Sequence, residues 1–138
     1  MPVTYEHQGQ VLIAVMPAEE LNRQEFEQHL NYVQGVFDRG KPFGMLVDAR
    51  LSPGMSADNR RLVAEQKDAQ FKQDPTRLVG TAVVLSSVLH RSVFSVISWL
   101  KSSSSPLRAF ADVPTAAAWL NSLLGGSSVN APTKRAQR

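Results

Sequence analysis

Short apolar runs alternate with amphipathic stretches along most of the chain. Residues 11–16, 43–47 and 78–85 are almost wholly apolar and too short for buried helices, which is typical of strands buried on both faces of a sheet. A partly alternating stretch at 3–7 and a short one at 107–111 add an edge strand and a last strand. The pattern predicts five strands, with residues 43–47 in the middle of the sheet.

Apolar residues at helical spacing fill the intervals between these strands and predict four helices. The predicted helices span residues 22–39, 56–72, 88–101 and 112–124. The resulting order, β-β-α-β-α-β-α-β-α, predicts an α/β fold with a single mixed, mostly parallel five-stranded sheet. The first two strands form an N-terminal β-hairpin and supply the one antiparallel edge.

The charge is unevenly distributed along the chain. Residues 1–124 contain twelve Lys and Arg and all twelve Asp and Glu, so this part is neutral. The net charge of +3 comes from three basic residues of the tail at 125–138. We expect one domain over 1–124 and a disordered basic tail over 125–138. A neutral body is poor evidence for a nucleic-acid binder, which normally has a basic face, so nucleic acid is not an expected partner.

Several kinds of chemistry find no support in the sequence. The chain has no cysteine, so disulfides and thiolate sites are excluded. His7, His29 and His90 lie far apart and are interpreted as surface or helix-face residues rather than metal ligands. No nucleophile elbow or phosphate-binding loop is found. We therefore expect no enzymatic activity, no catalytic residues, no cofactor and no metal.

The start of the chain lacks the basic and apolar regions of a secretory signal, and no apolar run approaches the length of a membrane span. A cytoplasmic location without stable membrane insertion is the expectation.

The chain resembles the SpoIIAA-like branch of STAS domains, whose fold is related to that of the CRAL-TRIO lipid-transfer domain. The resemblance covers residues 3 to about 124. It is carried by four segments: Leu46-Val47-Asp48-Ala49-Arg50, the Gly54-Met55-Ser56 loop, Ala82-Val83-Val84, and Phe110-Ala111-Asp112-Val113-Pro114-Thr115-Ala116-Ala117-Ala118-Trp119-Leu120.

The resemblance implies a non-enzymatic regulatory module that binds a protein partner through the loop and helix after the central strand. In the anti-sigma-antagonist members, a serine in an Asp-Ser-(Ser/Thr)-Gly motif at this helix start is phosphorylated. This chain has Met55-Ser56-Ala57-Asp58 there instead, so Ser56 is the candidate phosphorylation site and Ser52 the second match. The alternative is that Ser56 only caps the helix.

Candidate partner-binding residues cluster around this loop. They are Asp48, Arg50, Ser52, Met55, Ser56, Arg60 and Arg61. Asp48 and Asp58 offer oxygen ligands for a cation, but pairing with the nearby arginines is the preferred interpretation. The arginines suit a phosphate or an acidic partner, with an ordinary solvated face as the alternative.

Two further hypotheses concern self-association and ligand carriage. Trp99 falls off the main apolar stripe of its predicted helix and, together with the exposed edge strand, indicates a homodimer. The alternative function is a lipid or small-molecule carrier, as the CRAL-TRIO relationship allows. Its pocket is expected between the third helix and the sheet, as an enclosed apolar cavity of several hundred Å³.

Overall fold

The computed structural model describes residues 2–86 and 105–128 of the chain, and this part contains five strands and three helices. The elements are β1 (Thr4–Gln8), β2 (Val11–Val15), α1 (Arg23–Phe37), β3 (Phe43–Asp48), α2 (Ala57–Gln73), β4 (Leu78–Val84), β5 (Leu107–Phe110) and α4 (Val113–Ser128). The helix predicted at 88–101, with Trp99 on it, and the tail from 129 onward lie outside the described residues.

The sheet has the predicted topology. Its strand order is β1-β2-β3-β4-β5, so β3 is the central strand. β1 pairs with β2 in antiparallel fashion through a turn at Gly9, and the other three pairings are parallel. In the register of the centre, Leu46 lies between Ile13 and Ala82. The three apolar runs of the sequence are thus the three inner strands.

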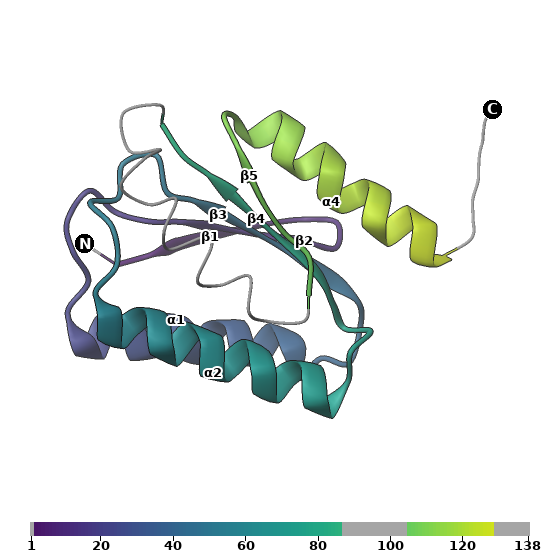
Figure 1. The fold of residues 1–138 in the computed structure, drawn as a ribbon. Coiled ribbons are helices and arrows are strands. Elements are labelled where there is room, and N and C mark those ends of the chain that lie inside the picture. The colour runs from purple at the N-terminus through teal and green to yellow at the C-terminus, as the bar shows by residue number, and fades with distance from the viewer. Residues whose placement is uncertain (1, 87–104, 129–138) are drawn as a thin grey trace.

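The helices cover the sheet from both sides (Figure 1). α1 and α2 lie against one face, and α4 crosses the other. Alternate residues of β2 and β3 therefore enter different cores: Ile13 and Leu46 pack with α4, whereas Leu12 and Met45 pack on the side of α1. This two-sided burial is why these strands are apolar throughout rather than alternating.

Two strand glycines allow α4 to approach the sheet closely. A Cβ atom at Gly80 would lie 2.8 Å from Leu123 Cδ1, and one at Gly44 would lie 3.1 Å from Leu120 Cβ. A glycine inside an otherwise apolar strand, as at position 80, is typical of such an approach. Both glycines place the backbone of the sheet against the same helix.

Side-chain caps fix the helix starts. Asn22 and Glu25 form the capping box at α1, with Glu25 N donating to Asn22 Oδ1 at 2.8 Å and Asn22 N donating to Glu25 Oε1 at 3.0 Å. At α4, Thr115 N donates to Asp112 Oδ1 at 2.8 Å. These caps lie where the sequence places the helix boundaries.

The predicted end of the last helix at 124 is wrong. α4 continues to Ser128, through Gly125 and Gly126. Glycine costs a helix about 1 kcal/mol relative to alanine but does not forbid it. Leu124, which is 6% exposed in the core, anchors the turn from which these residues continue.

Candidate functional site

Residues 51–56 leave the carboxyl end of the central strand and lead directly into α2. Leu51 at the start of this loop is 68% exposed. Within the described residues, the only other exposed large hydrophobic side chain is that of Phe71, which is 38% exposed and lies near the far end of α2. The loop thus presents an apolar side chain to solvent at the edge where α/β sheets usually bind their ligands and partners.

The loop has a defined conformation, because its own polar groups hold it. Ser52 N donates to Ala49 O at 3.1 Å, and Gly54 N donates to Ser52 Oγ at 3.2 Å. Gly54 has φ +118°, a value that favours glycine. Arg60 Nη1 donates to Met55 O at 2.9 Å, which ties the loop to the first turn of α2. Leu51 therefore lies on a loop that hydrogen bonds hold in place.

Asp48 and Arg50 form a bidentate ion pair at the start of the loop. Arg50 Nε donates to Asp48 Oδ1 at 2.9 Å, and Arg50 Nη2 donates to Asp48 Oδ2 at 2.7 Å. The hydrogen bonds from the guanidinium hold the pKa of Asp48 below its ordinary value, against the opposing effect of burial. Asp48 is only 7% exposed, so its role is to hold Arg50 at the base of the loop.

The second acidic candidate is also paired with an arginine. Arg61 Nη1 lies 3.2 Å from Asp58 Oδ1 on the exposed face of α2. Both pairings agree with the preferred interpretation of the sequence. Within the part of the chain that the structure describes, no cluster of three or more His, Asp and Glu side chains could hold a metal ion.

Ser56 is the N-cap of α2. Its exposed Oγ accepts a hydrogen bond from Asn59 N at 3.1 Å. The capping interpretation of Ser56 is thus confirmed, and phosphorylation stays a prediction. The seven candidate partner-binding residues lie together on the end of β3, the loop and the first turns of α2. The homodimer predicted from Trp99 and the edge strand stays a prediction.

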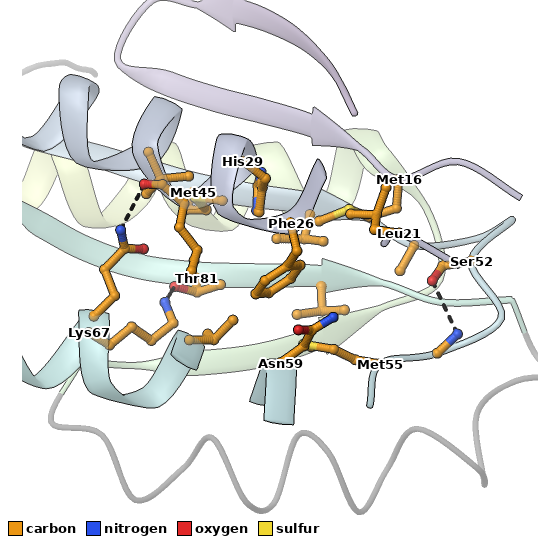
Figure 2. Close-up of a pocket in the computed structure, with 18 of the residues that line it drawn as sticks. Met16, Leu21, Phe26, His29, Met45, Ser52, Met55, Asn59, Lys67 and Thr81 are labelled. Atoms are coloured by element: carbon orange, nitrogen blue, oxygen red, sulfur yellow. Dashed lines mark hydrogen bonds between the residues drawn. The ribbon is translucent and has the colours of Figure 1, made fainter. Parts of the chain in front are cut away.

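A cavity of about 140 Å³ lies beside this loop, between the sheet and the two helices α1 and α2. Figure 2 shows Phe26 in its middle, with Met16, Leu21 and Met55 toward one end and Met45 toward the other. Ser52 and Met55 come from the loop, so the loop forms part of the cavity wall.

The cavity differs from the pocket that the sequence led us to expect. That pocket is expected between the third helix and the sheet, and because this helix lies outside the described residues, the expectation stays a prediction. The described cavity lies under α1 and α2 instead. It is also smaller than the several hundred Å³ typical of ligand pockets.

His29 lines this cavity from α1 and is only 5% exposed, so of the two interpretations, a surface or a helix-face residue, it is a helix-face residue on the buried side. Its Nδ1 lies 2.8 Å from Tyr5 Oη on β1. Burial, with a smaller effect of Lys67, lowers the pKa of His29 to about 4, so the ring is neutral near pH 7. The sequence signal for its burial was its position three residues after Phe26 and four before Val33, on the apolar stripe of the helix.

Lys67 enters the same cavity from α2. Its Nζ donates to Thr81 Oγ1 on β4 at 2.6 Å. The residue as a whole is half-buried, but its ammonium group lies inside the fold, and burial lowers its pKa to about 8. All acidic residues of the chain lie within the described ranges, and none of the ion pairs found there includes Lys67.

The inner face of α2 is mostly polar. Gln66 Nε2 donates to Leu30 O at 2.8 Å, and Gln70 Nε2 donates to Gln34 Oε1 at 3.0 Å, so α2 is joined to α1 by side-chain amides. Its buried residues are Asn59 and Gln70. The sequence missed this arrangement, because a buried face made of amides and a lysine has no apolar periodicity.

Comparison with known proteins identifies the fold. No protein-family model matches the chain, and no curated protein sequence matches it. Among solved structures, it is similar to an uncharacterised protein of the DUF3478 family with a SpoIIAA-like fold from Shewanella loihica, at TM-score 0.56 and 17% identity, covering 86% of this chain and 91% of that one. It is also similar to an anti-sigma factor antagonist from Mycobacterium paratuberculosis, at TM-score 0.60 and 11% identity, covering 86% and 92%.

These similarities show that the chain has a STAS/SpoIIAA-like fold, as its sequence predicted. None of the helices in the described ranges is long and apolar enough to cross a membrane.

Proposed function

We propose that this chain is a non-enzymatic regulatory module that binds a protein partner through residues 51–56 and the first turns of α2. The observation that carries the proposal is the 68% exposure of Leu51 on a loop held by its own hydrogen bonds. A large apolar side chain on a rigid loop, flanked by arginines, has the composition of a small protein interface. The likeness in fold to an anti-sigma factor antagonist supports the same function.

Affinity capture from the native cell extract tests this proposal with a matched pair of variants. Leu51→Ser removes the exposed side chain of the loop, and Phe71→Ser removes the other exposed hydrophobic side chain, near the far end of α2. We expect a captured protein that is retained by the wild type and Phe71→Ser but lost by Leu51→Ser. A thermal melt of each variant controls for folding. Equal capture by all three proteins would refute the role of the loop.

Ser56 offers a way to regulate this interface. A phosphate there carries close to two negative charges and lies at the N-terminus of α2, where the helix dipole favours it. The phosphate would attract Arg60, whose Nη1 now donates to Met55 O, and Arg61, which now pairs with Asp58. Phosphorylation therefore loosens the loop by withdrawing a hydrogen bond from it.

The substitutions Ser56→Asp and Ser56→Ala separate this switch from simple capping. Aspartate is a good cap that also carries charge, whereas alanine removes the cap and adds none. We expect Ser56→Asp to weaken partner capture and Ser56→Ala to leave it nearly unchanged. A partner that is held equally by both variants would argue against a phosphoswitch.

The lipid-carrier alternative has less support. A lipid carrier needs an enclosed pocket of several hundred Å³, and the described cavity measures about 140 Å³. Native mass spectrometry of the purified chain distinguishes the two functions, because a carrier would retain lipid.

A further inference from the structure

The cavity under α1 and α2 contains polar groups that the described residues leave without a full set of hydrogen bonds. Asn59 is 8% exposed and lines the cavity, and among the described residues its side-chain amide has no hydrogen-bond partner. Buried amides without a partner are uncommon in native proteins, so each requires an explanation. A bound molecule at the cavity wall supplies one.

Lys67 points to the charge of that molecule. An ammonium group has three N–H donors, and the single hydrogen bond found in the described part of the chain goes to Thr81. A buried cation without a carboxylate partner is unfavourable unless a bound anion neutralises its charge. A carboxylate is the anion of matching size, because its oxygens accept two or more such hydrogen bonds.

The geometry of α2 sets the length of the molecule. Asn59 and Lys67 lie eight residues apart on one helix, which corresponds to about 12 Å along its axis. Phe26 lies between them in Figure 2. A rigid small molecule with a polar group at each end and an apolar middle would span this distance.

The volume sets the bulk of the apolar middle. The cavity measures about 140 Å³, and an apolar protein cavity of about 150 Å³ is known to take benzene. A single six-membered ring therefore fits against Phe26, Met45 and Met55, whereas a long acyl chain does not.

From these observations we propose that the cavity binds a small aromatic carboxylic acid with a hydroxyl group opposite its carboxylate. The carboxylate accepts hydrogen bonds from Lys67, the ring packs against Phe26, and the hydroxyl pairs with Asn59. The acidic residues of the cavity wall, Glu19 and Glu20, lie in sequence between Met16 and Leu21, which are at the end away from Lys67 in Figure 2. Their negative charges disfavour an anion at that end, so they favour a ligand whose carboxylate lies at the Lys67 end. This binding site shares Ser52 and Met55 of the loop with the proposed partner-binding surface, but the binding of a small molecule inside the fold does not require that a protein partner binds outside.

Titration calorimetry of the full chain at pH 7 with three probes tests the proposal. The probes are 4-hydroxybenzoate, benzoate, which lacks the hydroxyl, and 4-hydroxybenzamide, which lacks the charge. We expect one 4-hydroxybenzoate to bind per chain, roughly tenfold or more tightly than 4-hydroxybenzamide, because a hydrogen bond to a charged group is worth at least that factor. Benzoate should be intermediate.

Two variants, with a third as a control, locate the bound molecule. Lys67→Met should remove the preference for the charged probe, and Lys72→Met, at an exposed position of the last turn of α2, should leave it unchanged. Asn59→Leu should reduce the affinity for 4-hydroxybenzoate to that for benzoate.

The proposal is overturned if 4-hydroxybenzoate shows no saturable binding at millimolar concentration, or if it and its amide bind equally to the wild type. That comparison needs no variant, so it decides the matter even if Lys67→Met fails to fold. Equal losses of affinity for 4-hydroxybenzoate in Lys67→Met and Lys72→Met would also contradict the site, because they would show that the anion is attracted non-specifically by positive charge.

Discussion

The two faces of the sheet are built in opposite ways. Toward α4 the centre of the core is apolar, with Leu46, Ala82 and Leu120 at 0% exposure. Toward α1 and α2 the same sheet meets buried polar residues, among them His29 and Thr81, and a cavity. Each face has an apolar cluster, but the face toward α1 and α2 also keeps polar groups whose burial does not favour folding.

The sequences of the covering helices explain this difference. Ala116, Leu120 and Leu124 of α4 recur at four-residue spacing in the core, and Leu120 and Leu123 fill the surface that Gly44 and Gly80 leave open. α2 has no such stripe and depends on amide hydrogen bonds to α1. Stability measurements on paired positions can therefore test the contrast.

The largest effect is expected on the α4 face. Leu120→Ala should lower the free energy of unfolding by about 4 kcal/mol, because it opens a cavity in a close-packed region. Met45→Ala, on the other face, should cost only about 2 kcal/mol, since Met45 already borders empty space. Urea unfolding of both variants measures the difference, and equal losses would break the contrast.

The buried histidine should make the α1 face sensitive to acid. The pKa of His29 is about 4 in the folded chain, below its ordinary 6.5, so the unfolded state binds more protons between these values. Stability is therefore lost as the pH falls from 6.5 to 4, by about 3 kcal/mol at about 1.36 kcal/mol per pKa unit. Unfolding curves of the wild type and His29→Gln, compared at pH 7 and pH 4, measure this loss.

If His29→Gln loses as much stability as the wild type over that range, the acid sensitivity arises elsewhere. Tyr5 does not complicate the measurement, because burial raises the pKa of its phenol to about 12.

Lys67 should show a smaller effect in the opposite direction. Its pKa falls from 10.5 to about 8 on folding, so below pH 8 the folded chain holds an unfavourable buried cation. Lys67→Met should therefore raise the stability at pH 7, by about 2 kcal/mol after allowance for partial exposure. The advantage should disappear as the pH rises from 8 to 10.5, where wild-type Lys67 is neutral in both states. A variant less stable than the wild type at pH 7 would indicate an unseen anionic partner.

The smallest effect is expected at the loop. Ser56→Ala should cost about 1 kcal/mol, as the loss of a helix cap usually does. Ser56→Asp should be nearly neutral, because aspartate can accept the same hydrogen bond from Asn59 N. Thermal unfolding of the two variants distinguishes them, and a similar loss in both would mean that the cap contributes little.

The fold was predictable because its signals are local. The apolar run at 43–47 is too short for a buried helix, and its neighbours in the sheet show the same pattern. Asn22 and Glu25 lie at the spacing of a capping box and form one. The loop after β3 was predictable in the same way, since the position of a strand end follows from the strand.

The cavity was not predictable, because it depends on how separate elements meet. Lys67 and Thr81 lie on different elements, and although Thr81 belongs to the buried run at 78–85, Lys67 belongs to no apolar pattern that would place it inside. The end of α4 was misplaced for a related reason: glycines at 125 and 126 resemble a helix stop, while the packing of Leu124 keeps the turn in place.

The position of α4 has a consequence for the newly made chain. As the ribosome synthesises the protein from its N-terminus, β2, β3 and β4 are complete by Val84, well before Val113 begins the helix that covers their outer face. During that interval Ile13, Leu46 and Ala82 lack the cover that they have in the finished fold. Nascent chains should therefore be most prone to aggregate, and most dependent on chaperones, just before their last helix emerges.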